Sequence, residues 1–241
     1  MKRTIFLSMV LCCLLSSQTF CQNYWKYPIV PGTKEWTELK SQEKIIAVQQ
    51  IPEIILKKMT TEEVYHAWLD LPGRMEILAF NSMQIGFNLV KKRYNVLNEL
   101  LNRKDAGSVI LSKFDKLSPL DLKKEWDSNT KGKFITDFAF DELLLSQPEI
   151  LESLSKKQKK DLFEKSKKDL GNKINFTGKN KDFFWISSSL VLGCRILEKE
   201  NIQFKEKIKS KKEIFGSITR GEALNKDEFE KLYEAITENN L

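Results

Sequence analysis

The sequence predicts an all-α protein, built of packed helical hairpins or an α-α superhelical array, with an extended N-terminal arm. Three observations support this prediction. Apolar residues recur at helical spacing in one segment after another. The 241 residues include only ten glycines and six prolines, which disfavours a turn-rich β fold. The polar stretches between the periodic segments are short, as they are between helices packed in hairpins.

The N-terminus has the pattern of a cleaved export signal. Lys2 and Arg3 precede an apolar run at residues 5–15. This run is too short for a bilayer-spanning helix, which takes about 20 residues, but it has the length and flanks of a signal peptide. We therefore expect residues 1–21 to be removed by cleavage before Gln22, and the mature protein to be periplasmic or extracellular.

Three alternatives stay open for this N-terminus: cleavage after Thr19, lipidation of Cys21, and retention of the segment as an uncleaved anchor. The letters "QTF" before Cys21 disfavour lipidation, because lipoprotein processing prefers Leu three residues before the cysteine and small residues next to it. No transmembrane segment is expected in the mature chain, since its most apolar stretch, after Asp182, is only about 12 residues long.

Residues 22–33 are expected to form the extended arm. Pro28 and Pro31 push the residues before them toward extended geometry, and Pro31-Gly32 is typical of a turn. The arm carries three aromatic residues, Tyr24, Trp25 and Tyr27. Two interpretations stand: these rings fasten the arm to the domain surface, or they form a stacking platform for a sugar or aromatic ligand.

The N-terminal helical half is predicted at residues 34–117, with Thr33 as the cap of its first helix. Thr60 and Glu63 have the spacing of a capping box, and Pro72-Gly73 is expected to end the helix that they begin. Two apolar helix faces are predicted in this half, one at Val64, Trp68 and Leu71, the other at Met83, Phe87, Val90 and Tyr94.

Asn95 and Asp105 are expected to cap the last two helices of this half. Residues 118–133 contain Pro119 and a polar cluster, and they are predicted to form a linker. The C-terminal helical half is predicted at residues 134–241, and the two halves together are expected to form one domain.

The C-terminal half contains a segment that is apolar on every side up to Arg195, which predicts a buried helix. Asp182 is expected to cap it. Ser189 and Gly193 lie four residues apart and would let a neighbouring helix approach closely. For the last helix the predicted caps are Asn225 and Glu228, and the predicted apolar face is Phe229, Leu232, Tyr233 and Ile236.

A faint internal repeat links residues 51–63 with residues 147–158. Each segment has a proline at a helix start, then Glu-Ile, and then a second capping pair. The pair is Thr60/Glu63 in one segment and Ser155/Gln158 in the other. Duplication of an α-hairpin and independent use of the same capping chemistry both explain the likeness.

Cys194 is the only cysteine of the predicted mature chain, so no intrachain disulfide can form. Its apolar neighbours predict a buried, inert thiol, because a nucleophilic cysteine needs a base beside it. The single histidine, His66, is far away in sequence. His66 is expected at the surface or its boundary, and it has no second histidine with which to bind a metal.

A lysine-rich stretch at residues 156–181 holds ten lysines and three acidic residues, in a chain of formal net charge +7. It is interpreted as a solvated helix face, with contact to anionic lipid or lipopolysaccharide as an alternative. Nucleic acid is not an expected partner. Only six of the 40 basic residues are arginines, the side chains whose planar fork recognises phosphate, and export removes nucleic acid from reach.

No catalytic residue, metal ligand or cofactor is assigned, since the sequence has no Gly-rich phosphate loop, zinc-type spacing or nucleophile elbow. Asp137 and Asp141 are a possible carboxylate pair for glycoside hydrolysis, but acids four apart on a helix are usually solvated. The stretch from Asp127 resembles the start of a calcium loop, with Phe138 where a bidentate Glu is needed. Asn175 begins a glycosylation sequon.

A series of short motifs runs along most of the mature chain: "YPIVPGTKEW" (27–36), "IPE" (51–53), "MTTEE" (59–63), "AFN" (79–81), "GF" (86–87), "NELLNRKDAG" (98–107), "LLLSQPEIL" (143–151) and "LGCRIL" (192–197). These motifs resemble an uncharacterised family of secreted all-helical bacterial proteins with no established activity. The resemblance implies export and a helical fold, and it implies no catalytic residue.

We expect a non-enzymatic interaction or binding module. The alternatives are a secreted hydrolase with carboxylates that the sequence does not single out, and a peripheral protein that contacts anionic lipid through the lysines of 156–181. A deep pocket with convergent acids would favour the enzyme, lysines gathered on one face would favour the lipid contact, and an exposed apolar patch would favour the interaction module.

Overall fold

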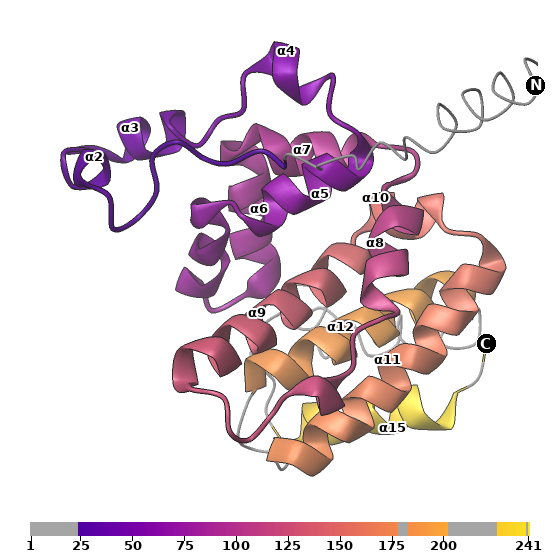
Figure 1. Ribbon diagram of the computed structural model, residues 1–241. Coiled ribbons are helices and arrows are strands. Elements are labelled where there is room, and N and C mark those ends of the chain that lie inside the picture. The colour runs from indigo at the N-terminus through magenta and orange to yellow at the C-terminus, as the bar shows by residue number, and fades with distance from the viewer. Residues whose placement is uncertain (1–23, 178–182, 202–225, 240) are drawn as a thin grey trace, which may run out of the picture.

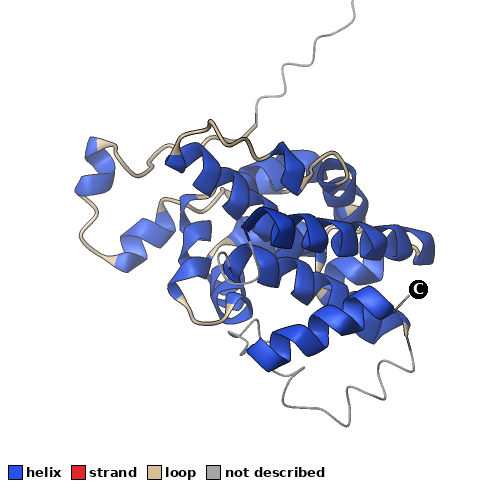
Figure 2. Cartoon of the chain, turned by 90° about the horizontal axis from the view of Figure 1, so that it is seen from below, coloured by secondary structure: helices blue, strands red, loops and turns tan. Residues whose placement is uncertain are grey.

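The computed structural model describes residues 24–177, 183–201, 226–239 and 241, and every regular element in these residues is a helix (Figures 1 and 2). The all-α prediction is confirmed for this part of the chain. The predicted signal peptide and the predicted caps Asp182 and Asn225 lie outside it.

The helices fall into two groups that follow each other along the chain. The first group is α2 (Lys34–Thr37), α3 (Gln42–Ala47), α4 (Glu53–Leu56), α5 (Thr61–Leu69), the 3-10 helix η1 (Pro72–Ala79), α6 (Met83–Arg93), α7 (Asn95–Asn102) and α8 (Ala106–Phe114). The second group is the 3-10 helix η2 (Pro119–Asp121), α9 (Ser128–Leu145), α10 (Pro148–Ser153), α11 (Lys156–Thr177), α12 (Phe183–Glu200) and α15 (Lys226–Glu238). Helices α8 and α10 pack between the groups (Figure 1).

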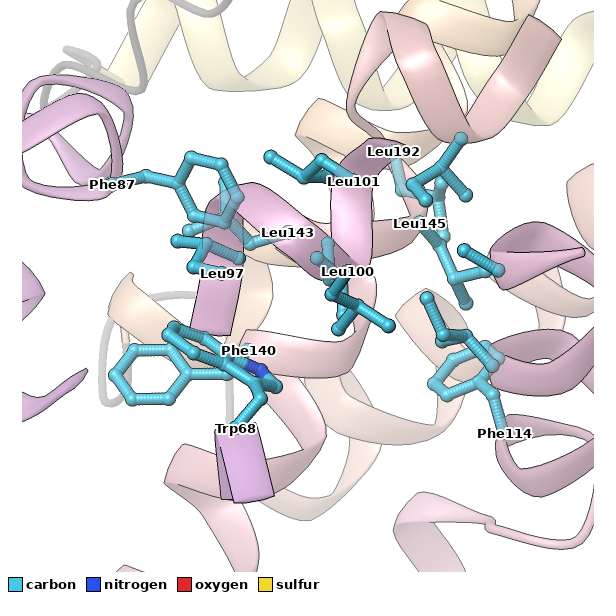
Figure 3. Close-up of a cluster of buried hydrophobic side chains, with 14 of the residues drawn as sticks. Trp68, Phe87, Leu97, Leu100, Leu101, Phe114, Phe140, Leu143, Leu145 and Leu192 are labelled. Carbon is cyan, nitrogen blue, oxygen red and sulfur yellow. The ribbon is translucent and has the colours of Figure 1, made fainter. Parts of the chain in front are cut away.

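One apolar core joins the two groups. Its buried side chains run from Tyr27 on the arm to Ile236 on α15 as a single cluster. Figure 3 shows part of this core, where Trp68 of α5 lies near Phe140 of α9. The Trp68 ring centroid is 6.4 Å from that of Phe140 and 6.4 Å from that of Phe87. A continuous core of this kind is consistent with the expected single domain.

The predicted apolar faces are confirmed. Every residue of the two apolar faces predicted in the first group is buried: Val64, Trp68, Leu71, Met83, Phe87, Val90 and Tyr94. On α15, Ile236 is buried, and Tyr233 is only partly buried against the core. Gly193 also acts as predicted, because a Cβ added there would lie 3.0 Å from a side-chain carbon of Ile236. Helix α12 therefore touches α15 closely at this residue.

Three of the predicted caps form as expected. The Thr33 side chain accepts a hydrogen bond from the first turn of α2. Thr60 and Glu63 form a capping box at the start of α5. Ser155 and Gln158 form the same reciprocal pair before α11, with distances of 2.9 and 3.2 Å. The two segments of the predicted repeat therefore share a short helix followed by a capped one.

Two other caps were predicted wrongly, because tertiary partners claim the side chains. Asn95 is the first residue of α7, and its amide donates to the carbonyl oxygen of Ile51 at 2.7 Å. Asp105 does precede α8, but its carboxylate accepts a hydrogen bond from the Thr61 hydroxyl at 2.6 Å and caps nothing. Partners more than 40 residues away replace the local bonds that the spacing suggested.

The predicted linker at 118–133 is also corrected, since α9 begins inside it at Ser128. Asp127 starts this helix by accepting hydrogen bonds from the backbone N–H groups of Asn129 and Thr130, at 2.9 and 3.1 Å. The first turns of α9 carry polar, exposed side chains, and a polar stretch of this kind has the composition of a loop. The irregular connection is therefore shorter than expected.

Gly86 allows the backbones of η1 and α6 to approach closely, because it has no side chain. We predict that Gly86→Ala lowers the free energy of unfolding by about 1–3 kcal/mol. A Cβ at this position would lie 2.5 Å from the carbonyl oxygen of Ile77, a backbone atom that cannot rotate away. Urea unfolding followed by circular dichroism measures the loss. Gly132→Ala is the matched control: it lies in α9 with nothing within 4 Å of the added carbon, so it should gain roughly 0.5–1 kcal/mol. Equal losses in the two variants would contradict the close contact.

Candidate functional site

The structure separates the two carboxylates that the sequence offered as a catalytic pair. Asp141 lies in the core, where the Tyr65 hydroxyl is 2.9 and 3.0 Å from its two carboxylate oxygens. Asp137 lies nearer the surface, where it accepts hydrogen bonds from Arg74 at 2.6 Å and Lys133 at 2.5 Å. Each acid is therefore held by partners of its own, and the two do not converge on a cleft among the described residues.

Burial dominates the electrostatics of Asp141. It raises the pKa of this carboxyl to about 7, and the hydrogen bond from Tyr65 offsets part of the rise. Such a group has the acidity of a general acid, but its side chain is only 2% exposed. Arg74 closes the cluster from the side of η1, with its guanidinium 5.6 Å from the ring centre of Phe140. As folded here, Asp141 cannot touch a substrate.

A second buried polar cluster joins α9, α11 and α12. The Lys173 ammonium lies 2.5 Å from the Glu142 carboxylate, and both side chains have no exposed surface. Lys173 also donates to the Trp185 carbonyl oxygen and to the Ser189 hydroxyl, each at 2.9 Å. Ser188 donates to the same Glu142 carboxylate. Burial lowers the pKa of Lys173, and Glu142 opposes that shift.

Helix α9 thus presents neighbouring acids to opposite sides of the fold. Asp141 meets α5, and Glu142 meets α11 and α12. The four helices are fixed in register by polar contacts that an apolar core would lack, and no substrate reaches either cluster in this conformation. Sequence reasoning missed Glu142 and Lys173. One signal could have found the lysine: it shares a helix face of α11, at spacings of four, three and four residues, with three other buried residues, Leu162, Ser166 and Asp169.

The lysines of 156–181 do not share one face among the described residues. Lys157 is exposed near the start of α11. Lys159 forms an ion pair with Glu200 of α12, and Lys165 donates to the backbone of the connection after α8. Lys173 is buried. Helix α11 therefore uses several of its lysines to hold its neighbours, and this arrangement gives little support to a lipid-binding lysine surface.

Two aromatic residues of the arm, Tyr24 and Tyr27, fasten it to α5, and the third, Trp25, is partly buried against the core. The Tyr24 ring lies 3.8 Å from the His66 ring, centre to centre. The Tyr27 hydroxyl donates to the Ala67 carbonyl oxygen at 3.2 Å. Trp25 meets Tyr27 edge to face, with ring centres 6.3 Å apart. The interpretation of the rings as fasteners is confirmed, and none of these contacts forms a row of parallel faces for a ligand.

The remaining candidates keep structural roles. Cys194 is buried, and burial raises the pKa of its thiol, as an inert cysteine requires. His66 lies at the surface boundary, and burial followed by the nearby Lys113 lowers its pKa. Asp127 caps α9, and Phe138 is buried in the core, so the calcium-loop resemblance has no counterpart. The described residues hold no group of three or more acidic, histidine or cysteine side chains placed for a metal ion.

Two groups of exposed apolar side chains are found on the first half of the fold. The first, which we call the η1–α6 patch, consists of Met75, Leu78, Phe80 and Ile85, exposed by 48, 43, 38 and 51%. The second is the pair Ile54 and Ile55 on α4, which we call the α4 tip. Single exposed apolar residues are common, whereas groups of them mark contact surfaces.

An open pocket of about 270 Å³ lies beside the α4 tip, lined by Trp25, Ile55, Lys58, Met59 and Glu63. Its volume lies at the lower limit of the range of small-molecule pockets, about 300–1,000 Å³. The Trp25 indole N–H is buried and donates no hydrogen bond. Within the part of the chain described here, no helix is both long and apolar enough to cross a bilayer.

Comparison with known proteins adds no relative: no family model, no curated protein and no solved structure matches the chain. The resemblance to an uncharacterised family of secreted helical proteins stays a hypothesis, and the functional interpretation depends on the geometry of the molecule itself.

Proposed function

We propose that the protein is an exported binding module that holds another exported protein through the η1–α6 patch, and that it is not an enzyme. The observation that supports this proposal is the gathering of four large apolar side chains in the eleven residues from Met75 to Ile85. A surface of this kind favours contact with a complementary apolar surface, because association removes both from water.

Local packing gives the patch its shape. Gly86 lets the backbone of α6 approach the backbone of Ile77 closely, and the exposed residues Leu78 and Ile85 are the sequence neighbours of Ile77 and Gly86. Helix η1 is also bonded to the end of α6, since Glu76 accepts hydrogen bonds from Arg93 and, at 2.5 Å, from the Tyr94 hydroxyl. A partner would therefore meet a rigid apolar surface, and we infer an amphipathic helix or strand as the segment that covers it.

The competing functions have less support. A carboxylate hydrolase needs acids that a substrate can reach, and Asp141 is enclosed while Asp137 is neutralised by Arg74 and Lys133. An anionic-lipid protein built on α11 needs lysines on one face, and Lys173 points into the core.

The proposal predicts that Leu78→Ser with Ile85→Ser abolishes capture of the partner. The tagged, exported chain is cross-linked in its source cells, the captured protein is identified and purified, and its dissociation constant is measured by calorimetry. We expect the double variant to bind at least about tenfold more weakly, because apolar anchors at the centre of an interface carry most of its energy.

Leu120→Ser is the control for this experiment, because Leu120 is equally apolar and 67% exposed but lies on η2. It should bind like the parent chain. Equal binding by the double variant would contradict the proposal. So would a dimer, seen in sedimentation velocity, that the double variant dissociates, since the patch would then bind a second copy instead.

A further inference from the structure

We propose that a proton on Asp141 controls how firmly η1 is held to α9, and that it thereby regulates partner capture at the η1–α6 patch. When the proton leaves to solvent, the Asp141 carboxylate accepts a hydrogen bond from the guanidinium of Arg74, which already binds Asp137. The regulation of capture rests on the proposed function of the patch. The change in the hold on η1 concerns the free chain and can be tested without a partner.

Helix η1 is attached to the two halves of the fold by different groups. Toward the first half, the Gly73 backbone N–H donates to the Gln49 side chain at 2.6 Å. Toward α9, the side-chain hydrogen bond that the described residues form is that of Arg74 to the Asp137 carboxylate, also at 2.6 Å. Arg74 is the residue immediately before Met75, the first residue of the patch. One side chain therefore links the patch-bearing segment to the second half of the fold.

Arg74 has a donor to spare. Its Nη2 atom binds Asp137, whereas its Nη1 atom is buried and has no acceptor among the described residues. The whole residue is only 7% exposed, so water reaches it poorly. A buried donor without an acceptor is costly, and it favours any change that brings an acceptor within reach.

The nearest turn of α9 carries such an acceptor. Asp137 and Asp141 are four residues apart, so they lie on the same face of the helix, about 5.4 Å apart along its axis. The Asp141 carboxylate is bonded to the Tyr65 hydroxyl, and within the described residues no cation forms an ion pair with it. The planar fork of a guanidinium can bind two acceptors at once. Arg74 is therefore placed to bridge the two acids.

Protonation decides whether the bridge forms. A neutral Asp141 attracts a guanidinium weakly, whereas an ionised carboxylate in the core needs a cation. Burial raises the pKa of Asp141 to about 7, so the change falls near neutral pH. The ionisable groups that act on it come from α5, η1 and α9, and they are Tyr65, Arg74, Asp137 and Glu142. Arg74 is the one cation among them, since Lys173 of α11 meets Glu142.

The second bond matters for the patch because of the kind of helix that carries it. Helix η1 has eight residues in 3-10 geometry, whereas such helices rarely exceed about four, and its own hydrogen bonds hold it less well than those of an α-helix would. Met75 and Leu78 of the patch belong to η1. A firmer hold on η1 presents them already ordered, which lowers the entropy lost on binding. Capture is therefore expected to strengthen as pH rises through 7.

Amide hydrogen exchange of the full exported chain, without a partner, tests the hold on η1. NMR gives protection factors for residues 75–77 at pH 5.5 and 8.0, each divided by that of Leu100 in the buried part of α7, which removes changes in global stability. In the parent chain this ratio should rise at least about threefold with pH. Exchange of the Arg74 Nη1 protons should slow over the same range.

Three variants make the test specific. Asp141→Asn cannot ionise, so its ratio should stay constant. Arg74→Lys keeps the charge but lacks the fork, so its ratio should also stay constant. Asp169→Asn is the matched control, because Asp169 is another buried acid whose pKa is raised by burial, but it pairs with Lys165 on α11. The rise should persist in this control.

A constant or falling ratio in the parent chain would overturn the proposal, and so would an equal rise in Asp141→Asn or a lost rise in Asp169→Asn. The regulatory part is tested with the partner identified by cross-linking, which should bind at least about threefold more tightly at pH 8.0 than at pH 5.5, and equally in Asp141→Asn. Equal binding by the parent chain at both pH values would overturn that part. Failure of the proposed function differs from both, since it appears as capture that does not depend on Leu78 and Ile85.

Discussion

Replacing Lys173 by Met is expected to lower the free energy of unfolding by about 3–5 kcal/mol, because the change leaves the Glu142 carboxylate buried without its cation. Both side chains are fully enclosed, and the ammonium lies 2.5 Å from the carboxylate. A charge in such surroundings cannot recover the hydration that it has in the unfolded chain. Urea unfolding at pH 7, followed by circular dichroism, measures the loss.

The matched control is Lys157→Met, on the same helix. Lys157 also pairs with an acid, Asp161 at 2.6 Å, but its side chain is 85% exposed. Water screens that pair, so the control should unfold almost like the parent chain. Similar losses at Lys157 and Lys173 would show that burial of the Glu142–Lys173 pair does not have the effect that the geometry implies.

A double variant separates the pair energy from general damage to the core. Glu142→Leu alone removes the buried carboxylate that faces the Lys173 ammonium and should cost a similar amount. Combined with Lys173→Met, it removes both charges, and buried ion pairs replaced by apolar side chains are often as stable as the original. We expect the double variant to lose much less than the sum of the singles. Additive losses would contradict a direct coupling between the two residues.

Lys173 also shows what the sequence could not reveal. It lies in a stretch so rich in lysine that a solvated helix face is the natural interpretation, and for Lys157 that interpretation is correct. The two lysines differ only in which side of α11 they occupy. The position of Lys173 is decided by its partners on α9 and α12. Glu142 lies 31 residues before it in the sequence, and Ser189 lies 16 residues after it.

Local rules succeeded where the partner is local. The capping box at Thr60 and Glu63 needs only a spacing of three residues, and the buried face of α6 needs only a helical period. Asn95 also has the residue type and position that predict a helix cap, but it forms no cap. Its side chain instead makes hydrogen bonds with the backbone of Ile51. The exposed η1–α6 patch was not predictable either, since which apolar residues stay uncovered depends on the whole packing.

Asp141 is the second residue with a large expected effect, and it should make the protein less stable as pH rises. Its pKa is raised to about 7 by burial, against about 3.9 in an unfolded chain. The folded state therefore holds this proton more tightly. The stability associated with neutral Asp141 is fully present below about pH 4 and is lost as pH rises through 7. Asp137 and Glu142 add to the rise, and Arg74 opposes it.

The variant Asp141→Asn should remove this dependence. The difference in unfolding free energy between the parent chain and the variant is expected to fall by about 1.4 kcal/mol per pH unit between pH 4 and pH 7, or roughly 4 kcal/mol in all. Urea unfolding of both proteins at pH 4.5, 5.5, 6.5 and 7.5 gives this difference directly, because titrations of other groups are common to both. A difference that stays constant with pH would show that Asp141 is ionised throughout.

Tyr65→Phe tests the physical origin of the effect. The Tyr65 hydroxyl lies within hydrogen-bond distance of both carboxylate oxygens, and this bond favours the ionised form. Without it, ionisation of Asp141 inside the core becomes harder, so the loss of stability should continue to a higher pH than in the parent chain. Combining Tyr65→Phe with Asp141→Asn should abolish that shift. If Tyr65→Phe instead moved the loss to lower pH, the hydroxyl would be stabilising the neutral acid, and the assignment of donor and acceptor would have to be reversed.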